Sequence, residues 1–155
     1  MQDVQKILSA MTLREKIAQM FLQYYQGYED MPERFVKMNQ ENILGGFIFF
    51  SGNNVKHIDQ LHAMNTRIQA RAGENKYHIP FLLTIDQEGG QLAAIFNGAT
   101  LFPGNMSLGL SDDPELAYQQ GRYVADELKY AGINFTFAPV LDVDYDVVNG
   151  APIVD

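Results

Sequence analysis

Cysteine is absent from the 155 residues of this chain. Without it, the chain can form no disulfide and can offer no thiolate nucleophile or zinc–cysteine site. Basic residues are also scarce, because 11 Lys and Arg stand against 19 Asp and Glu, for a formal net charge of -8. A surface for nucleic acid or for an anionic membrane needs basic side chains gathered on one face. Neither partner is therefore expected.

Long apolar runs are missing too. None approaches the ~20 residues of a membrane-spanning helix, and the N-terminal segment MQDVQKILSAMTLREK lacks the apolar core of a signal peptide. These absences favour a protein without a membrane partner and with a cytoplasmic location. The 46% hydrophobic and 19% charged residues are ordinary for one globular domain or part of one.

Apolar strands alternate with amphipathic helices along the chain. Thr12 and Glu15 form a capping box, which predicts a helix over residues 13–20. A second helix is expected from Pro32, at the first helical position, to about residue 42, and a third over residues 55–72. Apolar or aromatic runs predict strands at residues 20–25, 45–50, 81–86 and 134–143.

A longer helix is predicted between the last two strands. Asp113 suits its N-cap and Pro114 its first position, and Gly132 suits the residue that ends it. Helical spacing predicts that its buried face comprises Leu116, Ala117, Gly121, Val124, Leu128 and Ala131.

The alternation of strands and helices predicts an α/β fold made of parallel β/α units. A doubly wound sheet and a (β/α)8 barrel both satisfy this pattern. About four strands fill the 155 residues, and eight would need roughly twice that length, which lies within the size range of barrels. We therefore expect the N-terminal half of a TIM barrel, with about four β/α units.

The segment Asp86-Gln87-Glu88-Gly89-Gly90 follows a buried strand directly. Active sites of barrels form at this end of the strands, and glycines let the backbone approach a ligand closely. A carboxylate placed there can accept hydrogen bonds from sugar hydroxyls. The alternative is that Asp86 only caps a helix or shapes a turn.

Five blocks of sequence resemble one family in the order in which they occur. They are LREKIAQMF, GGFIFFSGN, FLLTIDQEGG, LFPGNMSLG and AGINFTFAPVLDV, and together they resemble the N-terminal domain of glycoside hydrolase family 3. The resemblance implies that residues 1–155 are the N-terminal part of a family 3 catalytic barrel. The Asp-x-Glu-Gly-Gly form is similar to bacterial exo-β-N-acetylglucosaminidases, which implies a saccharide substrate with a terminal β-linked N-acetylhexosamine.

The resemblance also implies which residues bind the sugar. Asp86 would contact hydroxyls of the terminal sugar, and the strand end that carries Asp142 would contribute to the same wall. Glu88, Gly89 and Gly90 match the family's turn. Alternatively, the Glu88 side chain is buried and holds that loop in place by hydrogen bonds to backbone N–H groups. No metal or organic cofactor is implied.

The family's catalytic groups are implied to lie elsewhere. A retaining mechanism uses an Asp nucleophile on a later strand and, in this subgroup, a His–Asp pair on a later loop. None of the catalytic residues falls within residues 1–155, and His57, His62 and His78 match no such motif. The isolated chain is therefore expected to be inactive.

Three positions depart from the family pattern. Gln91, Ala94 and Gly52 stand where the family often has arginine. Losing guanidinium groups removes bidentate partners for carboxylates or substrate. This leaves a second hypothesis open, in which the chain is a non-catalytic sugar-binding or assembly module.

Further alternatives are a β-glucosidase-type member of the family and a doubly wound nucleotide-binding domain. No Gly-x-Gly-x-x-Gly or Walker pattern follows any strand, which disfavours the nucleotide-binding domain. Half a barrel would leave residues 20–25 and 134–143 as unpaired sheet edges, and such edges recruit other chains. The isolated chain is therefore also expected to self-associate or to be poorly folded in solution.

Overall fold

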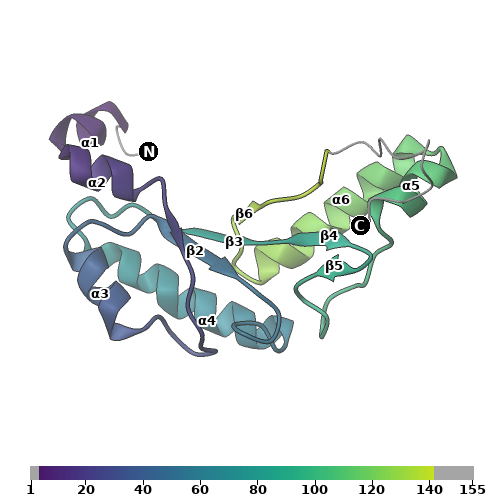
Figure 1. Ribbon diagram of the computed structural model, residues 1–155, viewed down its shortest axis with the longest axis horizontal. Coiled ribbons are helices and arrows are strands. Elements are labelled where there is room, and N and C mark those ends of the chain that lie inside the picture. Colours follow the sequence, from purple (N-terminus) through teal and green to yellow (C-terminus); the bar gives the residue numbers. More distant parts are fainter. Residues whose placement is uncertain (1–3, 142–155) are drawn as a thin grey trace, which may run out of the picture.

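The computed structural model describes residues 4–141. Its strands are short, and helices separate most of them (Figure 1). The helices are α1 (Val4–Ala10), α2 (Leu13–Ala18), α3 (Glu33–Gln40), α4 (Ile58–Ala70), the 3-10 helix η1 (Arg71–Glu74), α5 (Asn105–Ser111) and α6 (Pro114–Tyr130). The strands are β1 (Leu22–Gln23), β2 (Gly46–Phe49), β3 (Leu82–Ile85), β4 (Gln87–Gly89), β5 (Leu92–Ala93) and β6 (Phe135–Thr136).

Four of the strands form one parallel sheet in the order β1-β2-β3-β6, which is also their order in the chain. The ladder between β2 and β3 is the longest and runs from the pair Gly46 and Leu82 to the pair Phe49 and Ile85. β4 and β5 form a separate antiparallel hairpin directly after β3. The α/β class with a mostly parallel sheet, expected from the sequence, is confirmed.

The helix boundaries follow the local signals closely. The Thr12 hydroxyl accepts a hydrogen bond from the backbone N–H of Glu15, and the Glu15 carboxylate accepts one from the N–H of Thr12, so the capping box is formed. The carboxylate of Asp113 accepts the N–H of Glu115 at 3.0 Å and thereby starts α6. Each of these caps satisfies donors that a helix start leaves free.

Two expectations about the helices were wrong. Pro32 is the N-cap of α3, with an extended ψ of 152°, and not its first helical residue. Of the face expected to be buried on α6, Leu128 is buried, Ala131 is buried just past the helix end, and Leu116 remains 46% exposed. The N-terminal half of α6 lies over a cavity, so Ala117 and Gly121 line open space instead of packing on a strand.

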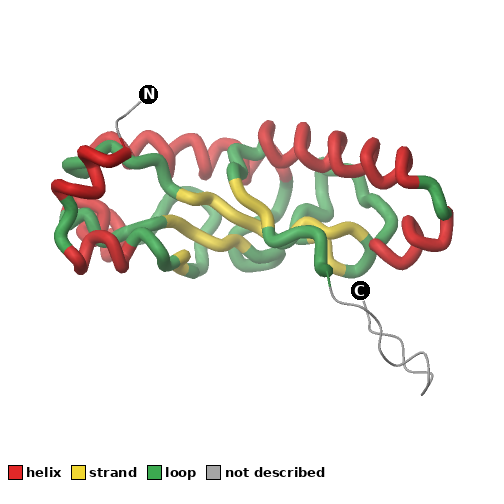
Figure 2. The backbone as a smooth tube through the Cα atoms, turned by 90° about the horizontal axis from the view of Figure 1, so that it is seen from above, coloured by secondary structure: helices red, strands yellow, loops and turns green. Residues whose placement is uncertain are grey.

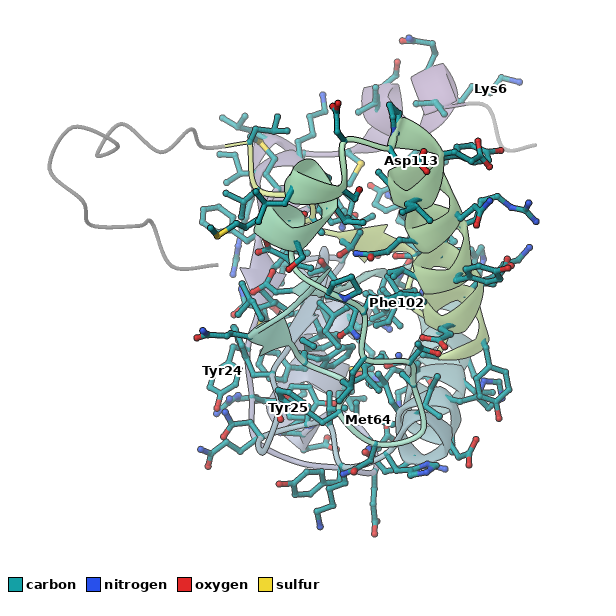
Figure 3. All side chains as sticks on the ribbon, turned by 90° about the vertical axis from the view of Figure 1, so that its right-hand side faces the viewer. Lys6, Tyr24, Tyr25, Met64, Phe102 and Asp113 are labelled. Carbon is teal, nitrogen blue, oxygen red and sulfur yellow. The ribbon has the colours of Figure 1, made fainter. Side chains whose placement is uncertain are left out.

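The core fills the space between the sheet and the helices. Tyr25, Phe35, Phe47 and Phe81 meet edge to face or tilted, with Phe47 at the centre and ring centroids 5.2 to 6.0 Å apart. The Tyr25 hydroxyl also lies 3.6 Å from the sulfur of Met64 on α4 (Figure 3). The inner face of α4 is buried at Ile58, Leu61, Asn65 and Ile68.

The two faces of the sheet differ. The long helices α4 and α6 run along one side of the strands (Figure 2). We call the opposite side the open face. Strand side chains alternate between the two sides, so Phe47 and Phe49 enter the core. Apolar residues on the open face are 36% to 47% exposed to solvent, namely Tyr24, Phe50, Leu82, Phe135 and Phe137.

Between Val4 and Leu141, no helix is both long enough and apolar enough to cross a membrane.

Candidate functional site

Asp86 stands one residue beyond the end of β3, at the edge of the sheet where the parallel strands end. Its side chain is half-buried. Among residues 4–141, no hydrogen-bond donor or cation is paired with its carboxylate. The open carboxyl edge of a parallel sheet is where α/β proteins bind their ligands.

The β4–β5 hairpin holds the backbone around Asp86. The N–H of Ala94 donates to the Asp86 carbonyl oxygen at 3.2 Å. The side chain of Gln87 is 6% exposed, and its Oε1 accepts the N–H of Ile95 at 3.0 Å. Gln87 therefore points into the protein interior and is fixed there by its hydrogen bond to Ile95. The hairpin fixes the direction in which the chain leaves β3.

Gly89 and Gly90 approach their own chain. Gly89 has a φ of +94°, and a Cβ built on it would lie 2.5 Å from the carbonyl oxygen of Pro103. The N–H of Gly90 donates to the carbonyl of Phe102 at 2.8 Å. The hairpin turn therefore needs glycine in order to pack on residues 102–104. Close approach to a ligand, the role expected for the two glycines, stays a prediction.

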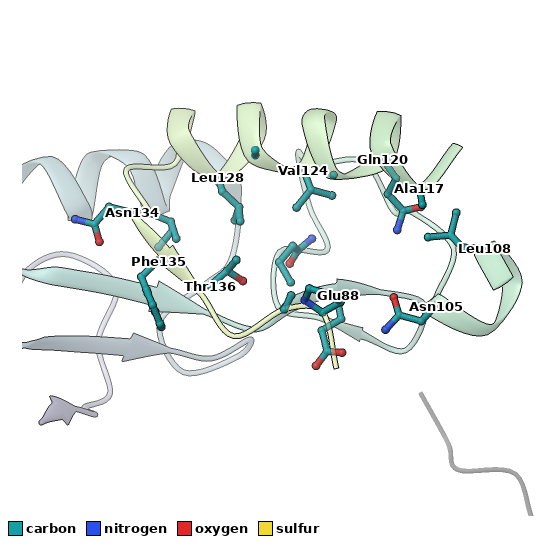
Figure 4. Close-up of a pocket in the computed structure, with 16 residues that line it drawn as sticks. Glu88, Asn105, Leu108, Ala117, Gln120, Val124, Leu128, Asn134, Phe135 and Thr136 are labelled. Atoms are coloured by element: carbon teal, nitrogen blue, oxygen red, sulfur yellow. The ribbon is translucent and has the colours of Figure 1, made fainter. Parts of the chain in front are cut away.

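Glu88 lies on β4 and is half-buried. Its carboxylate is directed away from α6 (Figure 4). Residues of a strand alternate in direction, which agrees with the inward direction of Gln87. Glu88 and Asp86 thus extend from the same stretch of backbone, on either side of the buried Gln87.

A cavity of about 520 Å³ lies between α6, α5 and the strands β4 and β6. Val124 and Leu128 of α6, Leu108 of α5 and Thr136 of β6 line it, and Asn105 and Gln120 contribute polar groups (Figure 4). Asp86 does not line it. The cavity is thus a gap in the layer between the helices and the strands. Gln87 and Glu88, which follow Asp86 directly, are among the residues that line it.

A buried asparagine that joins two loops was not predicted from the sequence. Asn54 is fully buried, and its Nδ2 donates to the carbonyls of Tyr25 at 2.8 Å and Gly27 at 3.2 Å. Its Oδ1 accepts the N–H of Phe50 at 3.3 Å. One side chain therefore ties the segment that follows β1 to the segment that follows β2. A lone asparagine in a polar loop gives no signal of this role.

The remaining predicted residues fall into two groups. Asp142 lies outside the described residues. The three histidines have structural contacts: His57 caps α4, His62 stacks on Tyr130 with ring centroids 4.9 Å apart, and His78 contacts the carbonyl of Gly73. Within residues 4–141, no three His, Asp or Glu side chains converge as metal ligands do.

The positions that depart from the family pattern lie in the loop after β2 and in or directly after the β4–β5 hairpin. Ala94 is 9% exposed and belongs to the segment that binds the Asp86 backbone. Gln91 is exposed at the tip of the hairpin. Gly52 has a φ of +73° and open space around its Cα. Arginine there would find room but would be strained by the left-handed backbone.

Comparison with known proteins decides the family. Residues 12–153 match the model of the glycosyl hydrolase family 3 N terminal domain. The chain belongs to glycosyl hydrolase family 3.

The relatives that this chain matches are much longer than it is. A protein named β-hexosaminidase A from Pseudoalteromonas piscicida is 33% identical over 118 residues, which are 74% of this chain and 20% of that protein. A β-hexosaminidase from Thiobacillus denitrificans is 38% identical over 109 residues, which are 66% of this chain and 29% of that protein. The chain therefore spans about a fifth to a third of these relatives.

A solved family 3 structure supports the same fold. A β-N-acetylglucosaminidase from Paenibacillus sp. is 37% identical with a TM-score of 0.79, over 86% of this chain and 25% of that one. NagZ from Neisseria gonorrhoeae is 27% identical with a TM-score of 0.64, over 81% of this chain and 39% of that one. This family 3 chain thus shares both sequence and fold with part of each.

Gly89→Ala should lower the free energy of unfolding by at least about 1–2 kcal/mol, because alanine is disfavoured at positive φ and its Cβ would collide with Pro103. Gly73→Ala is the matched control, since no atom lies within 4 Å of its Cβ position. It should be neutral or stabilising by about 0.4–1 kcal/mol. Urea unfolding compares the two, and equal effects would show that the hairpin turn does not require glycine.

Proposed function

We propose that residues 1–155 form the N-terminal half of a TIM barrel, with about four β/α units. In this proposal the barrel is the catalytic barrel of a retaining exo-glycosidase that removes terminal β-linked N-acetylhexosamine. Membership of family 3 and the relatives named β-hexosaminidase support the reaction and the substrate class. The saccharide is then the partner of this site.

The strand order supports a barrel over a doubly wound sheet. A doubly wound sheet reverses its strand order at a switch point, whereas β1, β2, β3 and β6 follow one another in chain order.

The carboxylate of Asp86, which is unpaired within the described part of the chain, is the observation that carries the functional proposal. It stands at the carboxyl edge of the sheet, and no described side chain neutralises it. We assign it the role of accepting hydrogen bonds from hydroxyls of the terminal sugar. Asp142 is proposed to contribute to the same wall, with Glu88, Gly89 and Gly90 forming the turn beside it.

A second candidate function is a non-catalytic sugar-binding or assembly module. Ala94 and Gln91 favour it, because neither can supply the guanidinium group that the family often places there. Catalysis by a chain that carries this segment together with the rest of the barrel would exclude the module.

In such a longer enzyme, Asp86→Ala should lower kcat/KM for an aryl β-N-acetylglucosaminide by at least tenfold, or about 1.4 kcal/mol of transition-state stabilisation. Asp126→Ala, an exposed carboxylate on α6, is the control and should leave kcat/KM unchanged. Equal values for wild type and Asp86→Ala would show that Asp86 is only a turn residue.

A polypeptide of these 155 residues should not hydrolyse the same aryl glycoside. The family mechanism needs a nucleophile and a proton donor on later segments, and no His or Asp of residues 1–155 matches either motif. Release of the aryl group is measured against buffer, with a full-length family 3 enzyme as the positive control. Turnover above buffer would refute this assignment of the catalytic groups.

The same polypeptide should self-associate through its unpaired sheet edges. Within the described part of the chain, β1 and β6 end the sheet, and unpaired edges recruit other strands. Phe135→Lys on β6 should reduce the association, because a charged side chain on an edge strand disfavours its pairing with another strand. Tyr118→Lys on α6 is the control and should leave the association unchanged. Sedimentation velocity measures both, and a compact wild-type monomer would contradict the proposal.

A further inference from the structure

Asp86 lies between two aromatic residues at the same level of the sheet. Ile85 pairs with Phe49 of β2 on one side and with Thr136 of β6 on the other. Phe50, Asp86 and Phe137 each follow one of these three residues. The N–H of Phe137 also donates to the carbonyl of Ile85 at 3.4 Å, so the ladder continues on that side.

These side chains share the open face. The ring of Phe135 points away from α6 (Figure 4), and Phe135 pairs with Thr84. Paired residues in a sheet point to the same side, and the direction repeats every second residue. Phe137 and Asp86 therefore extend from the open face, and the ring of Phe137 meets that of Phe135 with centroids 5.0 Å apart.

Tyr24 extends this row past Phe50. Their ring centroids are 5.4 Å apart at an angle of 71°, and the side chains are 41% and 36% exposed. Figure 3 shows Tyr24 at the outer edge of the molecule and Tyr25 turned inward near Met64. Each aromatic doublet, Tyr24-Tyr25 and Phe49-Phe50, thus sends one ring to the core and the other to the open face.

The pair is held in place before any ligand arrives. Asn54 binds the backbone on both sides, at Phe50 and at Tyr25, the residue after Tyr24. Its complete burial keeps water away from these hydrogen bonds. Exposed rings on a fixed backbone lose little conformational freedom on binding, which is an advantage for a recognition surface.

We propose that Tyr24 and Phe50 form an aromatic platform that receives the apolar face of a pyranose ring beside Asp86. A β-linked N-acetylhexosamine carries C–H bonds on its ring faces and hydroxyls around its rim. The negative ring faces of the aromatic pair suit the C–H bonds, and the carboxylate suits a rim hydroxyl. Ligand sites usually combine a few polar groups with apolar and aromatic side chains.

This inference rests on the proposed function. An organic cation is the other ligand that would suit rings beside a carboxylate. The family 3 match favours the sugar, and the cation is made an outcome of the test.

The test measures binding of methyl N-acetyl-β-glucosaminide to the 155-residue chain by saturation-transfer NMR, with the dissociation constant from a titration. Tyr24→Ala should weaken binding by about threefold to tenfold, the range expected when an aromatic contact is lost. Tyr24→Phe keeps the ring and should bind like wild type. Phe50→Leu keeps apolar volume at the neighbouring position, loses the ring and should also weaken binding.

Tyr118→Ala, which removes an exposed tyrosine on α6, is the matched control and should bind like wild type. If Asp86→Ala weakens binding while Tyr24→Ala matches Tyr118→Ala, the platform is overturned and the proposed function stands. A wild-type chain that shows no transfer to the sugar overturns the platform, whereas the proposed function is decided separately by kcat/KM in the longer enzyme. Displacement of the sugar by tetramethylammonium at equal concentration overturns the sugar as the occupant.

Discussion

The parallel ladder between β2 and β3 constrains the rest of this structure. Because side chains alternate along both strands, its register decides which rings enter the core and which reach the open face. A shift by one residue would exchange Phe47 and Phe49 for Ile48 and Phe50. The core around Phe47 would be lost, and the direction of Asp86 relative to its neighbours would change. The packing of the helices and the placement of the site therefore depend on one register.

Local signals were sufficient wherever a few neighbouring residues decide the structure. The capping box at Thr12 and the cap at Asp113 place the starts of α2 and α6, because these interactions are complete within four residues. The buried face of α6 was not predictable in full. Helical spacing says which residues share a face, but only the neighbouring elements decide whether that face is covered, and a cavity lies beneath Val124.

The site was predictable only in part, for a similar reason. A strand that ends in a carboxylate indicates Asp86 directly from the sequence. Nothing local indicates that Phe50 and Phe137 flank it, because that relation depends on the pairing of three strands distant in the chain. The hairpin after Asp86 was also unexpected, since its glycines serve the packing against residues 102–104. Membership of family 3, by contrast, was confirmed as the sequence resemblance implied.

The buried side-chain amide of Asn54 joins the loop after β1 to the loop after β2. It holds the carbonyls of Tyr25 and Gly27 with one end and the N–H of Phe50 with the other. A residue inserted into either loop would displace at least one of these groups and leave a buried polar atom unpaired, at a cost of about 1–3 kcal/mol. The lengths of the two loops are therefore not independent. A loop graft from a relative into this scaffold has to carry both segments together, with the asparagine that joins them.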